Sequence, residues 1–291
     1  MRTEQEMFDL ILAIAKDDPR VRVVGLNGSR TNPNAPKDIF QDYDVVYLVT
    51  EMESFLEQPD WIDVFGERVI MQTPEDMSLF PAELGNRYSY LMLFADGNRI
   101  DLMLIPVEDQ LEYVKEDTLT KILLDKDQAL PMIPLSTDQD YWVKKPTHEH
   151  YQDCCNEFWW ITSYIAKGLW REELLYALDH LNRHGRPMLY QMLTWRVGIE
   201  TDFSVSVGKS EKYLEKFLEE DTWNRVLNTF PRASYRATWQ ALFEMIELFR
   251  ETAAFVARHL EFDYPTGWDQ RVSAYLNKVK TLPKNATKFP E

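Results

Sequence analysis

The sequence predicts an α+β fold in which an N-terminal domain, built on a mixed β-sheet with flanking helices, is followed by a C-terminal helical bundle domain. Short apolar runs bounded by turn residues fill residues 1–138, which is typical of strands in a sheet. Apolar residues recur at helical spacing through residues 147–278. The segment DKDQALPMIPLSTDQDYWVKKPT, rich in proline and polar residues, is predicted to link the two regions. Residues 279–291 are predicted to form a poorly ordered tail.

Local patterns predict each N-terminal element in turn. MRTEQEMFDLILAIAKDD carries its apolar residues on one face of a helix. VRVVGLN is predicted to be a strand that ends at Gly28, and the second strand is predicted to run from Asp42 to Thr50. ERVIMQ is predicted to be the third strand. YSYLMLF and RIDLMLIP flank ADGN, and an Asp-Gly pair between apolar runs predicts a hairpin because its turn needs positive φ.

Three stripes of apolar residues predict helices in the second half. The first stripe runs from Tyr151 to Ile165, the second from Leu174 to Leu181, and the third from Trp239 to Val256. Each repeats with the period of one helical face, so each helix is expected to bury that face in a common core.

The chain is strongly acidic, with 32 Lys and Arg against 48 Asp and Glu and a net charge of −16. Such a surface repels a nucleic-acid backbone, whose binding relies on Lys and Arg, and attracts a cationic small substrate. Solubility alone is the other explanation of the charge. No apolar run reaches the roughly 18 residues of a membrane span, and the N-terminus lacks the layout of a signal peptide. We therefore expect a cytoplasmic protein that binds neither nucleic acid nor membrane.

Two aspartates stand one residue apart at the start of the second predicted strand. Asp42 and Asp44 point to the same face because side chains alternate along a strand. Two carboxylates on one face repel each other unless a cation lies between them. Mg²⁺ suits such a pair because it binds carboxylates together with the phosphate oxygens of a substrate. Asp42 and Asp44 are therefore predicted to ligate Mg²⁺.

Asp101 and the pair Gly28-Ser29 extend this site. Asp101 lies between apolar neighbours in RIDLMLIP, and it joins the other two acids if its strand lies beside theirs. Gly28 lets the backbone come close to a ligand, and the amides and the hydroxyl that follow can hold phosphate oxygens. A phosphate-binding turn that faces a metal site predicts metal-assisted transfer to or from a nucleoside triphosphate.

These residues resemble the signature of the nucleotidyltransferase superfamily: Gly28-Ser29, Asp42-x-Asp44 and then Asp101 in a later strand. The segments GSRTN, FQDYD, ELGN, DLMLIP, LLDKD, CCNEFWW, AKGLWREE, DHLN and VGKSEKYLEKFL are similar to those of the aminoglycoside 6-adenylyltransferases, which modify streptomycin. The resemblance implies a nucleotidyltransferase-type N-terminal sheet. It also implies Mg²⁺-dependent transfer of AMP from ATP to a hydroxyl of a cationic aminoglycoside, at the 6-position of streptomycin, with loss of pyrophosphate and inactivation of the antibiotic.

The resemblance also implies roles for the three acids. Asp42 and Asp44 would hold the Mg²⁺ that bridges the ATP phosphates. Asp101 would complete the metal site or act as the general base toward the acceptor hydroxyl. These two roles compete, because a nearby metal lowers the pKa of a carboxyl.

The remaining candidates bind the two substrates. Nucleotide binding is assigned to Gly28, Ser29 and Arg30 and to the basic residues Lys167, Arg196 and Lys209 of the helical half. For each of the last three, a solvated surface charge is the alternative. Carboxylates form charge-assisted bonds with the guanidinium groups of streptomycin. Candidates for acceptor binding are Glu83, Asp179 and Asn182, the last two at i, i+3 on one helical face.

Two other functions stay open. The protein could be a nucleotidyltransferase that acts on another acceptor, such as a protein side chain or an RNA end, although the acidic charge counts against RNA. It could also be a nucleotide-binding regulator without catalysis, although the intact acids count against that.

Overall fold

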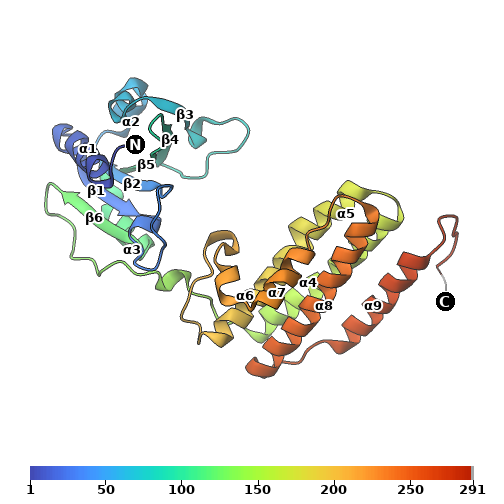
Figure 1. Cartoon of the computed structure of the whole chain (residues 1–291). Helices are drawn as coiled ribbons and strands as arrows, with labels where there is room; N and C mark the ends of the chain where they lie inside the picture. Colours follow the sequence, from blue (N-terminus) through green and yellow to red (C-terminus); the bar gives the residue numbers. More distant parts are fainter. Residues whose placement is uncertain (290–291) are drawn as a thin grey trace. The chain divides into compact units, whose positions relative to one another are not determined.

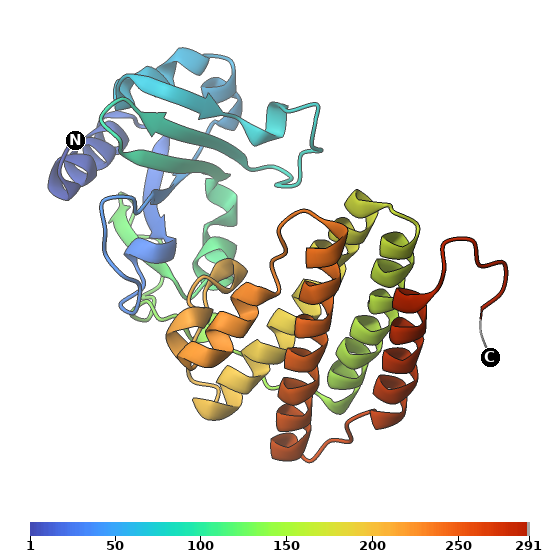
Figure 2. The same cartoon turned by 45° about the vertical axis from the view of Figure 1, so that its right-hand side comes forward.

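The computed structural model describes residues 1–289, and the chain divides into two compact units, Met1–Asp140 and Tyr141–Glu291 (Figures 1 and 2). The first unit contains a mixed sheet with helices, and the second consists of helices joined by loops. The predicted α+β class is therefore confirmed.

A six-stranded sheet forms the centre of the first unit, in the strand order β3-β4-β5-β2-β1-β6. The strands are β1 Val21–Asn27, β2 Tyr43–Val49, β3 Arg68–Gln72, β4 Tyr88–Phe94, β5 Arg99–Pro106 and β6 Thr120–Asp125. Strands β2 and β5 run parallel, and the other neighbouring pairs run antiparallel. Because of the parallel pairing, the first residues of β2 and β5 lie side by side at the same end of the sheet.

Helix α1 (Glu4–Asp17) packs on one face of this sheet, together with α2 (Met52–Leu56) and the 3₁₀ segment Pro59–Phe65. A capping box between Thr3 and Glu6 begins α1. Its buried face joins a core that includes Tyr47 of β2, whose hydroxyl donates to the Ile11 carbonyl at 2.6 Å. The predicted amphipathic helix is thus confirmed.

Helix α3 (Gln110–Glu116) packs on the opposite face. Strand alternation places Val46 and Leu48 of β2 on this face, where they form a small core with Tyr113 of α3. Gly25 of β1 makes room for this contact, because a Cβ at that position would lie 1.9 Å from the Tyr113 hydroxyl oxygen. Asp44, two residues before Val46, has the same parity and lies on the same face.

The predicted strands and the hairpin are confirmed, with one shift and two additions. Gly97 has a φ of +86° in the turn between β4 and β5, as the Asp-Gly pair predicts. Asp42 directly precedes β2 instead of lying within it. The local pattern does not predict α3 or β6. Strand β6 pairs with β1 through a contact distant in sequence, which a short run such as TKILLD does not reveal.

The second unit is a bundle of helices: α4 His148–Trp170, α5 Leu174–His180, α6 Arg186–Glu200, α7 Glu220–Asn228, α8 Tyr235–Leu260 and α9 Thr266–Thr281. The predicted apolar stripes on α4 and α8 meet in its core, where the rings of Phe158 and Phe249 stack with centroids 3.7 Å apart. A π-helical turn, Leu181–Gly185, joins α5 to α6. Arg250 of α8 donates two hydrogen bonds of 2.6 Å to Asp269 of α9 and so ties these helices together.

The C-terminal end departs from the expected boundary, because α9 continues to Thr281 and residues 279–281 are therefore helical. Residues 290 and 291 of the predicted tail lie outside the described residues. None of the helices in residues 1–289 combines the length and the apolar character that a membrane crossing requires.

Candidate active site

The three predicted aspartates lie close together on the sheet face that carries α3. Asp44 of β2 and Asp101 of β5 are direct partners across the parallel pair. Asp42 precedes β2, and its carboxylate lies 3.6 Å from Arg99 Nη1, while the same guanidinium binds Asp101. The strand of Asp101 thus lies beside that of Asp44, which is the arrangement that the sequence analysis required for the acids to converge.

Gly28 brings the end of β1 against Asp44. Asn27, the last residue of β1, is the register partner of Asp44, and Gly28 follows with a φ of +68°. A Cβ at position 28 would lie 2.3 Å from Asp44 Oδ2, and the positive φ also disfavours any other residue. Glycine therefore allows the turn Gly28–Arg30, with Ser29 at its centre, to begin next to the carboxylate.

Burial and the neighbouring like charges raise the free energy of the ionised carboxylates in this site. The pKa of Asp44 is raised from 3.8 to about 6, first by burial and then by the charges of Asp101 and Asp42. Burial also raises the pKa of Asp42, an effect that Arg99 opposes. A further cation near Asp44 would lower this cost, so the electrostatics favour the arrival of a metal ion.

Arg99 is a charged member of this site that the sequence analysis missed. Its Nε and Nη2 donate to the two carboxylate oxygens of Asp101 at 2.7 and 2.8 Å. This pairing with Asp101 raises the pKa of the Arg99 guanidinium. The signal was present in the sequence, because Arg99 stands two residues before Asp101 in one strand and therefore points to the same face.

Arg30 faces the backbone that leads into β2. Its Nε donates to the Asp42 carbonyl at 3.0 Å and its Nη2 to the Gln41 carbonyl at 2.8 Å. Its guanidinium carbon lies 3.6 Å from the centroid of the Tyr43 ring, and its side chain is only 9% exposed. In this conformation, Arg30 positions the segment that carries Asp42, and it does not line the cavity beside the acids.

The donor set suits a divalent metal that prefers oxygen ligands. Asp42, Asp44 and Asp101 supply only carboxylate oxygens, which is the chemistry that Mg²⁺ selects. Within residues 1–289, no three His, Cys, Asp or Glu side chains are already arranged as a metal-binding cluster. Arg99 holds both oxygens of Asp101, so metal binding by Asp101 requires this guanidinium to move.

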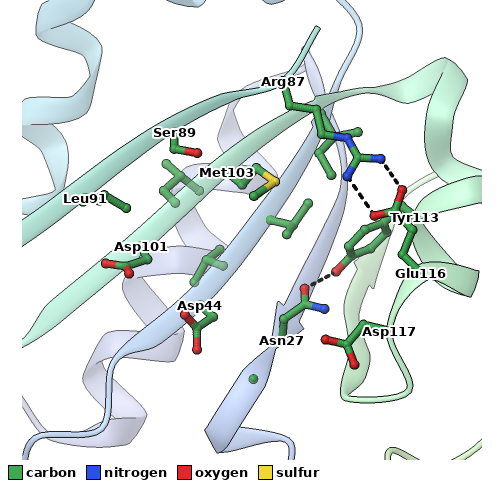
Figure 3. A pocket seen from close by; sticks show the side chains of 15 residues that line it. Asn27, Asp44, Arg87, Ser89, Leu91, Asp101, Met103, Tyr113, Glu116 and Asp117 are labelled. Carbon is green, nitrogen blue, oxygen red and sulfur yellow. Dashed lines mark hydrogen bonds and ion pairs between the residues drawn. The ribbon is translucent and has the colours of Figure 1, made fainter. Parts of the chain in front are cut away.

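A cavity of about 430 Å³ begins at Asp44 and Asp101 and extends over the sheet to α3 (Figure 3). Its far end carries Arg87, which directly precedes β4, and Glu116 of α3. Tyr113 lies at its wall and donates a hydrogen bond of 2.7 Å to Asn27 Oδ1. None of the residues at the α3 end was predicted from the sequence, because the local pattern does not predict α3.

The three predicted cations of the helical half lie on different elements of the second unit. Lys167 is in the last turn of α4, with its Nζ 4.4 Å from the centroid of the Tyr164 ring. Arg196 of α6 donates to Glu200 Oε1 at 2.8 Å. Lys209 is exposed at the start of the 3₁₀ turn Lys209–Glu211, which follows α6. Arg196 lines a cavity of about 470 Å³, together with Arg225, Arg250 and Arg258.

The predicted acceptor-binding residues are exposed. Asp179 of α5 forms an ion pair of 3.3 Å with Arg183. Asn182 accepts a hydrogen bond of 3.1 Å from Arg186 and lies in the π-helical turn, which changes the regular i, i+3 spacing assumed for it and Asp179. Glu83 lies in the loop before β4 and does not line the cavity beside the three aspartates.

Comparisons with known proteins point to one family. The family model described as Streptomycin adenylyltransferase matches residues 1–279. The chain is 45% identical over 280 residues to the aminoglycoside 6-adenylyltransferase of Bacillus subtilis (strain 168), which covers 96% of this chain and 98% of that protein. It is also 45% identical over 280 residues to the enzyme of the same name from Campylobacter jejuni, with 96% of each chain covered.

A third relative agrees. The chain is 42% identical over 266 residues to the aminoglycoside 6-adenylyltransferase of Staphylococcus aureus, with 91% of this chain and 94% of that protein covered. Among solved structures, it is similar to the crystal structure of an aminoglycoside 6-adenyltransferase from Bacillus subtilis. That comparison gives 40% identity, coverage of 97% of this chain and 100% of the other, and a TM-score of 0.49.

Proposed function

The chain belongs to the streptomycin adenylyltransferase family, and on that premise we propose that it transfers AMP from ATP to an aminoglycoside, specifically to the 6-hydroxyl of streptomycin, with Mg²⁺ as cofactor. The relatives named above support adenylyl transfer to an aminoglycoside. The observation that carries the proposal for this chain is the direct pairing of Asp44 with Asp101 beside the Gly28 turn. Because ATP is the proposed donor, we place the reaction in the cytoplasm.

Asp42, Asp44 and Asp101 would hold Mg²⁺, which supplies positive charge where charge develops on the α-phosphate and on the pyrophosphate. The raised pKa of Asp44, about 6, supports this assignment, because a buried carboxylate beside two others is stabilised by a cation. The turn Gly28–Arg30 lies against Asp44, so the amides and the hydroxyl at Gly28 and Ser29 are available to phosphate oxygens next to the acids.

Asp101 is the proposed general base. Its carboxylate oxygens are held by Arg99, so we propose that Arg99 moves when substrates bind and frees one of them for the acceptor hydroxyl. The acceptor oxygen then bonds to the α-phosphorus, the bond from that phosphorus to pyrophosphate breaks, and the hydroxyl proton passes to Asp101. If Asp101 ligates the metal through the other oxygen, its basicity falls, and the two roles compete.

The second unit is proposed to contribute to both substrates. Arg196 is the best placed of the three predicted cations, because it lines a cavity with three other arginines, whereas Lys209 is an exposed residue of a 3₁₀ turn. Lys167, Arg196 and Lys209 remain the proposed phosphate-binding candidates. The exposed Glu83, Asp179 and Asn182 remain the candidates for the cationic acceptor.

Pyrophosphate release tests the proposal. The protein is incubated with ATP, Mg²⁺ and streptomycin, and we expect pyrophosphate together with streptomycin carrying one added AMP, located at the 6-hydroxyl by NMR. EDTA and the Asp42→Asn variant should each abolish the release, whereas the exposed charge change Glu112→Gln should not. Absence of release with every aminoglycoside of a panel, or undiminished release by Asp42→Asn, would refute the proposal. Release with another aminoglycoside but not with streptomycin would refute only the streptomycin assignment.

A further inference from the structure

Ser29 lies at the centre of the turn Gly28–Arg30 and carries its donors for a phosphate. The N–H of Gly28 donates to the Leu119 carbonyl at 3.2 Å, so the phosphate contact of the proposed function narrows to the N–H and the hydroxyl of Ser29. The Ser29 hydroxyl accepts a long hydrogen bond of 3.5 Å from Gln41 Nε2 and keeps its hydrogen for a ligand. Two donors on one residue hold a phosphate oxygen only if the turn keeps that residue in place.

The turn has little stiffness of its own. Gly28 has a φ of +68°, and a residue without a Cβ reaches many other conformations at little cost. Asn27, which precedes the turn, forms no side-chain cap to it. The Asn27 amide is engaged elsewhere: its Oδ1 accepts from the Tyr113 hydroxyl at 2.7 Å (Figure 3), and its Nδ2 donates to Thr120 Oγ1 at 2.7 Å. The end of β1 is thereby fixed, whereas the turn depends on the residue that follows it.

Thr31 follows the turn and is hydrogen-bonded through its hydroxyl, its N–H and its carbonyl. The hydroxyl oxygen lies 2.9 Å from both the Gly28 and the Leu119 carbonyl oxygens, and the N–H donates to the Gly28 carbonyl at 3.1 Å. The Thr31 carbonyl accepts a hydrogen bond of 2.7 Å from Ser136 Oγ. Thr31 is only 7% exposed, so water does not readily replace these bonds. Its hydroxyl therefore ties the turn to the segment that leads into β6.

We propose that Thr31 is a positioning residue for ATP, whose buried hydroxyl holds the turn so that the N–H and the hydroxyl of Ser29 meet the phosphate oxygens beside Asp44. The inference rests on the proposed function and goes beyond it, because it names the residue on which the phosphate contact depends. Thr31 acts through Ser29 and touches no substrate, since its one hydroxyl hydrogen is committed to carbonyl groups of the protein.

A purely structural role for the Thr31 hydroxyl is the alternative, and the hydrogen bonds around it favour positioning. Strands β1 and β6 are paired from Val23 to Asn27 without any contribution from Thr31. If the hydroxyl is removed, the Leu119 carbonyl keeps the Gly28 N–H, and the Gly28 carbonyl keeps the Thr31 N–H. The loss of the hydroxyl should therefore loosen the turn without disturbing the sheet.

Calorimetry of ATP binding with Mg²⁺ and without acceptor, together with steady-state kinetics for both substrates, tests the inference. Thr31→Val removes the hydroxyl and keeps the branched shape, whereas Thr31→Ser keeps the hydroxyl. Thr162→Val is the matched control, because Thr162 is buried in α4 of the second unit and its hydroxyl donates to the Trp159 carbonyl at 2.7 Å. Circular dichroism spectra and melting curves establish folding, and Thr31→Ala is the second variant that lacks the hydroxyl.

We expect the KM and the Kd for ATP to rise about ten-fold in Thr31→Val, and to stay within about two-fold of the wild type in Thr31→Ser and Thr162→Val. The KM for streptomycin should change less than about two-fold in all variants. Unchanged constants for ATP in folded Thr31→Val or Thr31→Ala would overturn the inference. Equal losses in Thr31→Val and Thr31→Ser, or parallel rises in the KM for both substrates, would also overturn it, because they would show general damage.

The proposed function and this inference fail in different ways. If the wild-type protein transfers no AMP to any aminoglycoside, the proposed function fails, while the Kd for ATP still tests the role of Thr31. If the wild-type protein is active and the variants at position 31 bind ATP as it does, only the role of Thr31 is refuted.

Discussion

Replacing Asp44 with asparagine should stabilise the substrate-free protein while it abolishes catalysis. Asp44 is buried beside two other carboxylates, and its pKa is raised from 3.8 to about 6. Asparagine has nearly the same shape but no charge. It therefore removes the electrostatic cost and keeps the contacts of the side chain with Gly28 and β5. A gain in stability together with a loss of activity is expected for an active site whose repelling carboxylates are stabilised only when a cationic ligand binds.

The size of the effect follows from the two pKa values. Between pH 4 and pH 6, the folded protein binds more protons at Asp44 than the unfolded chain does, so stability falls as the pH rises through this window. The difference between 3.8 and about 6 corresponds to about 3 kcal/mol when the carboxyl is fully ionised. Asp44→Asn should therefore gain up to about 3 kcal/mol at pH 8 and almost nothing near pH 4.

Urea unfolding at pH 8 and at pH 4.5 measures this gain in the free energy of unfolding. Hydrogen exchange of peptides from β2 and β5 reports the stability of the first unit separately from that of the helical unit. Asp9→Asn, an exposed position on α1, is the matched control and should show no such gain. The reasoning is refuted if Asp44→Asn is no more stable than the wild type at pH 8, or if its gain is the same at both pH values.

Three further substitutions test the geometry around the acids. Gly28→Ala places a Cβ against Asp44 at a positive φ, so transfer activity should fall about 100-fold and stability by about 1–3 kcal/mol, measured by steady-state kinetics and urea unfolding. Arg99→Gln frees Asp101, so Mn²⁺ should bind the nucleotide-free protein about ten-fold more tightly by calorimetry; weaker binding would mean that Arg99 helps to form the metal site. Arg30→Gln loses the bonds to the backbone before β2, so kcat should fall about ten-fold while the circular dichroism spectrum is preserved; an unchanged kcat would contradict the positioning role.

The sequence by itself determined the local features of this protein. The spacing of Asp42 and Asp44 indicated a shared face, and Gly28 at the end of a strand indicated a close approach of the backbone. The Asp-Gly pair and the apolar periodicities predicted the hairpin, the first helix and the helical second half, all of which the structure contains. Each of these features depends on residues a few positions apart, and strand or helix geometry fixes their relation before any tertiary contact forms.

Only the tertiary structure decided which distant groups meet. Asp101 joins Asp44 because β5 pairs with β2 in parallel and in that register, a choice made by packing between segments far apart in the chain. The same packing brings Arg99 Nη1 to 3.6 Å from Asp42 and places α3 over the sheet, so that Ser89, Arg87 and Glu116 line one cavity. Local sequence contains no such information, because a charge or a hydroxyl acquires its partner, and its cost of burial, only when the sheet has formed.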